Sequence, residues 1–321
     1  MSHLLEYIDI NEFKCFKNFH AEGFKRVNLI SGKNNVGKTA FIEACWINLH
    51  SKNINSFLFA LENINFARNN LEYIQSGYSK EDMIKNIEKN NFHVNSNINK
   101  TIFYVNDEKG VKSYEFTIND LNEKININKF SYSSDWIKNT IHIDNFGLTN
   151  GNLKDIFESV QKKDKENTLY KYINNFDSSI ENFKIIGGDK PQCKVINGDY
   201  RDINEFGDGL KHYISIICSL YACENGYLFI DEIDNGIHYT QLDKLWEIIL
   251  TISKEQNVQI FATTHAKEMI ESYARVSTKL EDEDISFIKM TRLDDGSLKA
   301  GVRDYDMIQD SMEENHEVRG W

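Results

Sequence analysis

The segment from Gly32 to Thr39 has the residue types and the spacing that bind the phosphates of a nucleotide. It reads Gly32, Lys33, Asn34, Asn35, Val36, Gly37, Lys38 and Thr39, and Ala40 follows in the helix expected after it. Glycines let successive backbone N–H groups turn toward an anion, and the helix directs the positive end of its dipole at the same point. Lys38 can reach the β- and γ-phosphates, and the Thr39 hydroxyl can bind Mg²⁺. The segment predicts a site for ATP and Mg²⁺.

A pair of acids, Asp231 and Glu232, follows four apolar residues at 227–230. This pattern predicts a buried strand that ends at two carboxylates, at the edge of a sheet where a phosphate loop would also lie. We expect Asp231 to hold Mg²⁺, usually through water, and Glu232 to orient and deprotonate the attacking water. A strand followed by a polar loop is common, so the interpretation depends on the phosphate loop upstream.

A histidine, His265, follows a second short apolar strand at 259–263. A lone histidine is more often a surface or core residue than a functional one. Because it follows the next strand after the acids, we expect it to sense the γ-phosphate.

The elements that must position these residues are strands alternating with helices. The pattern predicts a strand over 27–31, a helix after Lys38, a helix over 209–224, strands over 227–231 and 258–263, helices over 240–254 and 266–274, and a hairpin about Asp294-Asp295-Gly296. Such alternation favours a parallel sheet covered by helices. We therefore expect an α/β fold in which residues 1–50 and 205–321 form a split head.

Residues 51–204 are expected to form an inserted lobe with antiparallel strands and helices. Strands are predicted over 101–105, 111–117 and 139–143, and helices over 152–162 and 167–177. The segment is rich in asparagine, isoleucine and lysine, and its role does not follow from its composition.

The composition restricts the function classes. The chain has 37 Lys and Arg and 49 Asp and Glu residues, a formal net charge of −12, and 40% hydrophobic residues. This balance suits a globular chain and argues against a non-specific nucleic-acid coat, which needs a strongly basic surface. Lysines gather at 80–171, but they alternate with acids, which favours a mixed surface over a DNA-binding strip; DNA binding stays open. The lysines are Lys80, Lys85, Lys89, Lys100, Lys162, Lys163, Lys165 and Lys171.

The expected location is the cytoplasm. No apolar run approaches the ~20 residues that span a bilayer, and the first residues lack the features of a signal peptide. The five cysteines contain no CxxC pair, which fits reduced thiols better than a disulfide framework or a zinc site.

The order of phosphate loop, Asp231-Glu232 and Thr264-His265 resembles the ABC-type ATPases that are not transporters, and more closely the RecF/SMC-like group and the OLD-like ATPases. The segments 8–17 and 231–238 and the ending Glu317-Val318-Arg319 are also similar to the family's patterns. The resemblance covers residues 1–50 and 205–321 and implies a short member without a Toprim domain. It implies ATP held between two chains, hence a homodimer or a higher homo-oligomer.

The resemblance also implies a signature segment before a helix, here Gly207, Asp208 and Gly209. The family's serine is absent, and Asp208 brings a negative charge toward phosphate. A bulky residue at Gly209 is expected to block the partner without affecting nucleotide binding. Gln75 and Arg68 are both candidates for the glutamine-loop residue, although an exposed helix position is the more common reading of each.

Three functions follow from these patterns. The first is a sensor or switch ATPase of an antiphage or DNA-maintenance system, acting with a separately encoded nuclease or toxin. The second is a nuclease, through the D-x-D pairs at Asp282-Asp284 and Asp304-Asp306, which read more simply as a solvated acidic stretch. The third is a scaffold that binds nucleotide without hydrolysing it, against which the intact Glu232 and His265 count.

Overall fold

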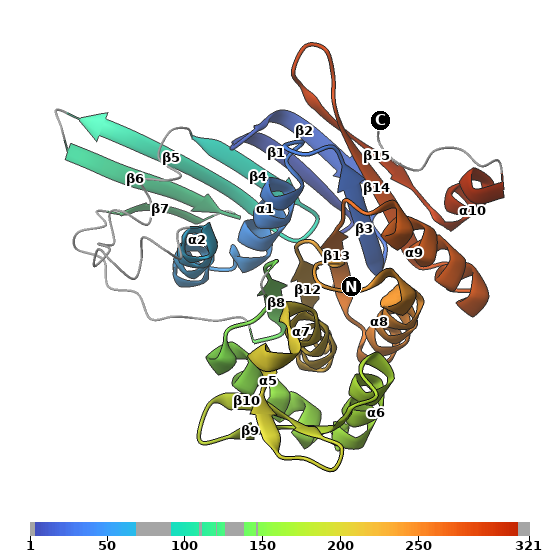
Figure 1. The fold of residues 1–321 in the computed structure, drawn as a ribbon. Helices are drawn as coiled ribbons and strands as arrows, with labels where there is room; N and C mark the ends of the chain where they lie inside the picture. Colours follow the sequence, from blue (N-terminus) through green and yellow to red (C-terminus); the bar gives the residue numbers. More distant parts are fainter. Residues whose placement is uncertain are drawn as a thin grey trace. The chain divides into compact units, whose positions relative to one another are not determined.

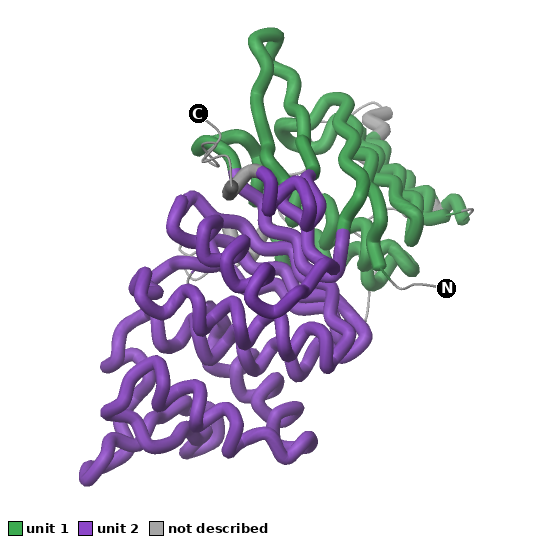
Figure 2. Tube along the Cα trace, turned by 90° about the vertical axis from the view of Figure 1, so that its right-hand side faces the viewer, with its two compact units in different colours: residues 1–24, 32–137, 288–302 green, residues 25–31, 138–287, 303–321 purple. Residues whose placement is uncertain are grey.

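The computed structural model describes residues 4–68, 91–108, 111–119, 121–125, 138–145 and 147–313. The chain divides into two compact units, coloured separately in Figure 2. Unit 1 comprises residues 1–24, 32–137 and 288–302, and unit 2 comprises residues 25–31, 138–287 and 303–321. One of the boundaries between the units falls inside the strand β3 (Val27–Gly32), which runs directly into the phosphate loop. The head and inserted lobe expected from the sequence stay a prediction.

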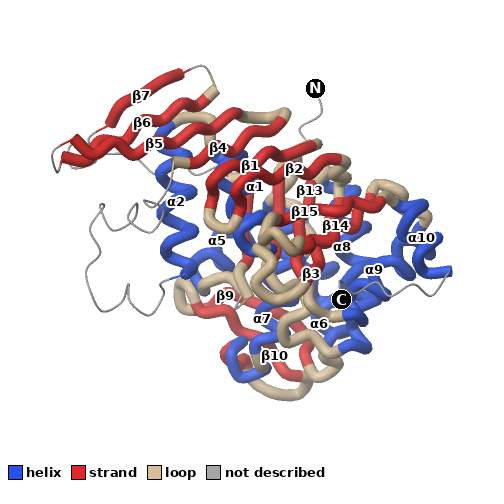
Figure 3. Tube along the Cα trace, turned by 90° about the horizontal axis from the view of Figure 1, so that it is seen from above, coloured by secondary structure: helices blue, strands red, loops and turns tan. Residues whose placement is uncertain are grey.

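Unit 1 contains a six-stranded antiparallel sheet in the order β2-β1-β4-β5-β6-β7, whose strands lie side by side in Figures 1 and 3. The strands are β1 (Tyr7–Phe13), β2 (Phe16–Glu22), β4 (Phe92–Ser96), β5 (Lys100–Glu108), β6 (Val111–Ile118) and β7 (Leu121–Ile125). Two helices, α1 (Lys38–His50) and α2 (Ile54–Arg68), follow the phosphate loop. The rings of Phe57, Phe92, Phe103 and Phe116 pack together between α2 and the sheet, which gives this unit an aromatic core.

Unit 2 is built around the parallel strands β3, β13 (Gln259–Thr263), β12 (Tyr227–Ile230) and β8 (Thr140–Ile143). The complete strand order of this sheet is β15-β14-β3-β13-β12-β8, and most residues of β14 (Ile285–Arg292) and β15 (Leu298–Arg303) belong to unit 1. Strands β3 and β13 are buried along their whole length, as expected for strands covered on both faces. Parallel pairing brings the carboxyl ends of β3, β12 and β13 to one edge of the sheet.

The helices of unit 2 are α5 (Asn150–Lys162), α6 (Glu166–Phe176), α7 (Asp208–Ala222), α8 (Leu242–Gln256), α9 (Lys267–Leu280) and α10 (Tyr305–Glu313). Helix α7 packs against α5 and α8, and α8 packs against α9. Trp246 of α8 and Tyr273 of α9 are fully buried, with ring centroids 4.6 Å apart. A three-stranded antiparallel sheet, β9 (Ile180–Ile186), β10 (Lys190–Val195) and β11 (Tyr200–Asp202), leads through a short 3-10 helix (Ile203–Phe206) to α7.

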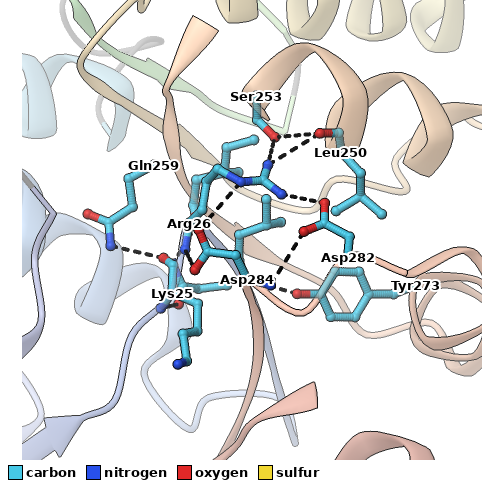
Figure 4. Close-up of polar contacts among 11 residues, drawn as sticks. Lys25, Arg26, Leu250, Ser253, Gln259, Tyr273, Asp282 and Asp284 are labelled. Carbon is cyan, nitrogen blue, oxygen red and sulfur yellow. Dashed lines mark hydrogen bonds and ion pairs between the residues drawn. The ribbon is translucent and has the colours of Figure 1, made fainter. Parts of the chain in front are cut away.

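A buried ion pair between Arg26 and Asp282 joins the beginning of β3 to the segment before β14 (Figure 4). The guanidinium also donates to Ser253 and to the Leu250 carbonyl, and the Arg26 N–H donates to Asp284 at 3.2 Å. Buried charges require such pairing because they lose their hydration. The interpretation of Asp282 as part of a solvated acidic stretch is therefore wrong, because its side chain is only 6% exposed. Its carboxylate is engaged in packing rather than offered to a metal.

Removing the Asp282 carboxylate should destabilise unit 2. In Asp282→Ala the Arg26 guanidinium stays buried without its main counter-charge, and we expect the free energy of unfolding to fall by about 3 kcal/mol. Urea denaturation followed by the fluorescence of the buried Trp246 measures this. The control is Asp294→Ala, at an exposed turn, which should change the free energy of unfolding by less than about 0.5 kcal/mol. Equal stability of the two variants would show that the pair contributes nothing.

The predicted α/β fold with a helix-covered sheet is confirmed. The helices and strands predicted after residue 205 begin within two residues of those observed, although α9 extends six residues beyond its predicted end. The hairpin about residues 294–296 joins β14 and β15, with Leu293 N–H donating to the Ser297 carbonyl. The sheet β9–β11 and helix α10 are not predicted from the sequence. No helix in the described part of the chain is long and apolar enough to cross a membrane.

Candidate functional site

The phosphate loop of unit 1 is folded by close backbone packing. A Cβ placed at Gly32 would lie 2.5 Å from the Met290 carbonyl oxygen and 2.8 Å from Val36 Cγ1, so no larger residue fits. Gly37 has φ 92°, in the left-handed region, and is the N-cap of α1 with no side-chain hydrogen bond to the helix. Because glycine has no side chain, no Gly37 side chain competes with an anion for the N–H groups in the first turn of α1.

Lys38 lies buried across this loop. Its ammonium donates to the carbonyl oxygens of Gly32 at 3.0 Å and of Lys33 at 3.2 Å, so the charge is held inside the turn. Thr39 follows, half-buried, while Lys33, Asn34 and Asn35 are exposed. A backbone turn that holds a cation has the chemistry to bind a polyphosphate, so the residues present fit the predicted ATP site.

Two residues that the sequence analysis missed hold the loop. Arg292 of β14 donates from Nη2 to the Asn35 carbonyl at 3.1 Å, and Asn35 is in the left-handed region with φ 60°. A Cβ at Gly37 would lie 2.6 Å from Cys15 Sγ, so the thiol packs directly on the loop. Burial raises the pKa of the Cys15 thiol, which keeps it neutral and keeps negative charge away from a phosphate site.

The acids of unit 2 are placed where the sequence predicts, at the carboxyl end of β12. Asp231 donates its N–H to the Ile143 carbonyl at 2.9 Å, and its carboxylate accepts a hydrogen bond from the Thr263 hydroxyl at 2.5 Å. Glu232 has φ 52°, a conformation that residues with a Cβ rarely adopt. Its side chain is 44% exposed, so it is open to water. The strand end thus carries one fixed carboxylate and one that faces solvent.

His265 lies beside Glu232, as the strand order predicts. Its Nε2 is 3.9 Å from Glu232 Oε1, and both side chains are partly exposed. The preceding Thr264 donates its hydroxyl to Asp234 at 2.5 Å and accepts the Ala266 N–H at 3.0 Å. The structure therefore brings together Asp231, Glu232 and His265 within unit 2.

The strand that enters the phosphate loop belongs to the same parallel sheet. Ile30 pairs with Thr263, and Thr264 N–H donates to the Ile30 carbonyl at 3.0 Å. Two residues after Ile30 the loop begins at Gly32. The phosphate loop therefore continues directly from β3, and β3 pairs with β13, the strand that precedes His265.

The signature segment opens helix α7, as expected. Gly207 is the N-cap residue of α7 with φ 86°, and as a glycine it has no side chain that could cap the helix. Asp208 is exposed, whereas Gly209 is buried against Gly236, where a Cβ on Gly236 would lie 2.7 Å from the Gly209 nitrogen. A Cβ on Gly209 would overlap the Gly236 carbonyl. A bulky residue at Gly209 therefore cannot serve to block the partner alone, as the sequence analysis expects, because this glycine packs against Gly236 within its own chain.

One turn later, α7 carries a fully buried histidine. His212 is 1% exposed, and burial lowers its pKa to about 4, so the imidazole is neutral at physiological pH. The neutral His212 therefore adds no charge near the signature segment, and α7 contributes only its N-terminus there.

The other sequence candidates divide into three groups. Gln75 lies outside the described residues, as do Lys80, Lys85, Lys89 and the ending Glu317-Val318-Arg319. Arg68 is the last residue of α2. Lys162 and Lys163 pair with Glu158 at 3.1 Å and with Glu224 at 2.8 Å, which supports a mixed surface. Among the described residues, no group of three or more His, Cys, Asp and Glu side chains could hold a metal ion alone.

The chain is similar to proteins of known class. A family model described as "AAA domain, putative AbiEii toxin, Type IV TA system" matches residues 27–268. A Helicobacter pylori protein named ATP/GTP phosphatase is 26% identical, over 84% of this chain and 87% of its own. An uncharacterised Methanocaldococcus jannaschii protein is 34% identical, but over only 20% of this chain and 57% of its own.

Solved structures agree in fold. An Smc head bound to the C-terminal winged-helix domain of ScpA has a TM-score of 0.54 at 14% identity, and covers 94% of this chain and 98% of its own. The Pyrococcus furiosus Smc head with an extended coiled coil has a TM-score of 0.53 at 13% identity, and covers 98% of this chain and 99% of its own. These identities support the fold alone. From the extent of the family match, the chain belongs to the family described as "AAA domain, putative AbiEii toxin, Type IV TA system", and it is an ATPase.

Proposed function

We propose that the chain hydrolyses ATP with Mg²⁺ through the loop 32–40, Asp231, Glu232 and His265. Lys38 holds the β- and γ-phosphates, Thr39 and Asp231 hold Mg²⁺, Glu232 activates water and His265 contacts the γ-phosphate. The observation that carries the proposal is the order of the parallel sheet, in which the strand entering the loop, the strand ending at the acids and the strand ending at His265 are neighbours. Ligands of α/β sheets bind outside the carboxyl ends of such strands.

We also propose that two chains share each nucleotide, in a homodimer or a higher homo-oligomer. Gly207, Asp208 and Gly209 of one chain then face the phosphates held by the loop of the other. The uncapped and exposed beginning of α7 supports this, because its free N–H groups and dipole suit a phosphate oxygen.

A bulky residue at the exposed Asp208 tests the shared site. We expect Asp208→Trp to keep ATP affinity and to lower hydrolysis by at least about tenfold, because the partner's nucleotide can no longer approach α7. An equal mixture with Lys38→Ala chains should recover up to about a quarter of wild-type activity, since one site of each mixed dimer keeps both intact halves.

The control is Asp189→Trp, an equally exposed acid in the turn between β9 and β10. Phosphate release measures the activity, and light scattering with ATP measures the dimer. Wild-type hydrolysis by Asp208→Trp alone would contradict the shared site.

The proposed biological role is a cytoplasmic sensor or switch of an antiphage or DNA-maintenance system, resembling the OLD-like group. It would act with a separately encoded nuclease or toxin. The toxin–antitoxin description of the family supports a partnered role. The nuclease alternative loses one of its two D-x-D pairs, because Asp282 is buried with Arg26. Co-purification of the chain from its native host, with ATP and with ADP, tests whether a partner depends on the nucleotide state.

A further inference from the structure

The hydroxyl of Thr263, the last residue of β13, lies between the two acids. It donates to Asp231 Oδ1 at 2.5 Å and accepts the Glu232 N–H at 2.8 Å. A hydroxyl has one proton, so its donation to the carboxylate leaves its lone pairs for the N–H group. The residue is fully buried, so water does not compete for these bonds. One side chain thus contacts both acids that the proposed hydrolysis would use.

The backbone of Thr263 extends this contact to a third residue. Its carbonyl accepts the Ile233 N–H at 2.9 Å, and Glu232 accepts the Asn235 N–H at 2.8 Å. These bonds enclose the left-handed Glu232, whose φ is 52°. Because such a conformation persists only where its surroundings impose it, Thr263 is a main cause of the direction in which the Glu232 side chain leaves the strand.

We propose that Thr263 is a positioning residue that fixes the Asp231 carboxylate and the Glu232 backbone in one frame. This inference rests on the proposed hydrolysis of ATP with Mg²⁺. The hydroxyl orients Asp231 toward the metal, as outer-shell partners orient carboxylate ligands, and keeps Glu232 at a constant position relative to it. In this proposal Thr263 does not contact the nucleotide itself and acts only through Asp231 and Glu232.

The variants Thr263→Val and Thr263→Ser separate the hydroxyl from its shape. Valine keeps the size and removes both hydrogen bonds, so we expect kcat to fall about 10- to 100-fold. Serine keeps both bonds, so kcat should stay within about threefold of wild type. The control is Thr101→Val in β5, because the buried Thr101 hydroxyl has no hydrogen-bond partner in the described part of the chain and its loss should change nothing.

A second readout does not use activity. Electron paramagnetic resonance of Mn²⁺, titrated with a non-hydrolysable ATP analogue, should show about tenfold weaker metal binding in Thr263→Val. Binding of the analogue without metal should not change, because the phosphate loop is untouched. If the valine variant does not fold, Thr263→Cys replaces it, because a thiol is a weak donor and should lose kcat where serine keeps it.

The outcomes separate the two proposals. If wild type does not hydrolyse ATP, the proposed function fails whatever the variants do. If wild type is active and Thr263→Val matches it in kcat and in Mn²⁺ binding, the positioning role is overturned. Equal loss of activity and of melting temperature in the serine and valine variants would also overturn it, because the hydroxyl would then be irrelevant.

Discussion

Replacing Lys38 by alanine should abolish ATP binding, with an affinity at least about 100-fold below that of wild type. The Lys38 ammonium is the cation held inside the phosphate loop, on the carbonyls of Gly32 and Lys33. Alanine removes the charge that the β- and γ-phosphates would contact. It also removes the two hydrogen bonds from Lys38 to the carbonyls of Gly32 and Lys33, which close the loop. Calorimetric titration of the variant with ATP measures the effect.

The matched control for Lys38→Ala is Lys33→Ala, an exposed lysine of the same loop. It removes the same charge from the sequence but leaves the inside of the loop intact, so ATP affinity should change by no more than a few-fold. Circular dichroism checks that both variants fold. Wild-type affinity in Lys38→Ala would show that the loop is not the phosphate site.

Replacing Glu232 by glutamine should separate hydrolysis from binding. The amide keeps the size and one hydrogen-bonding oxygen but cannot take a proton, so turnover should fall roughly 100-fold or more while ATP stays bound. Dimers held by ATP should then accumulate, and light scattering detects them. Glutamine bears the same left-handed backbone, so the comparison leaves the strain at φ 52° unchanged.

Glu283→Gln is the control for Glu232→Gln, because Glu283 is an exposed acid that precedes β14 and does not lie at the carboxyl end of β12 or β13. It should hydrolyse ATP at the wild-type rate. Unchanged turnover in Glu232→Gln would move water activation to His265, whose Nε2 is 3.9 Å from Glu232. His265→Ala would then lose the activity that Glu232→Gln keeps.

The sequence predicts the strand ends well, because each is an apolar run followed at once by polar residues. The run 227–230 and the acids Asp231 and Glu232 need only local information, and parallel pairing supplies the rest. Strands β9 and β10 were missed because their exposure pattern is irregular and Gly187 and Gly188 separate them. Charged and polar residues interrupt both strands, so neither has the continuous apolar run that marks β12 and β13.

Long-range partners could not be predicted from the sequence. Asp282 stands in an acidic run that looks solvated, and its partner Arg26 is 256 residues away. Gly209 looked like a flexible glycine of the signature segment, and only the approach of Gly236 shows that it is a packing position. The Thr263 hydroxyl is likewise unremarkable until the register places it opposite the acids.

The close approach of Gly209 and Gly236 has a consequence for cooperativity. With no room for a side chain on either backbone, the beginning of α7 cannot move closer to the loop that follows Glu232 without displacing it. In the proposed dimer, that loop serves the nucleotide of its own chain, whereas the beginning of α7 serves the nucleotide of the partner. Each chain would then link two active sites mechanically, and ATP hydrolysis at one would alter the rate at the other.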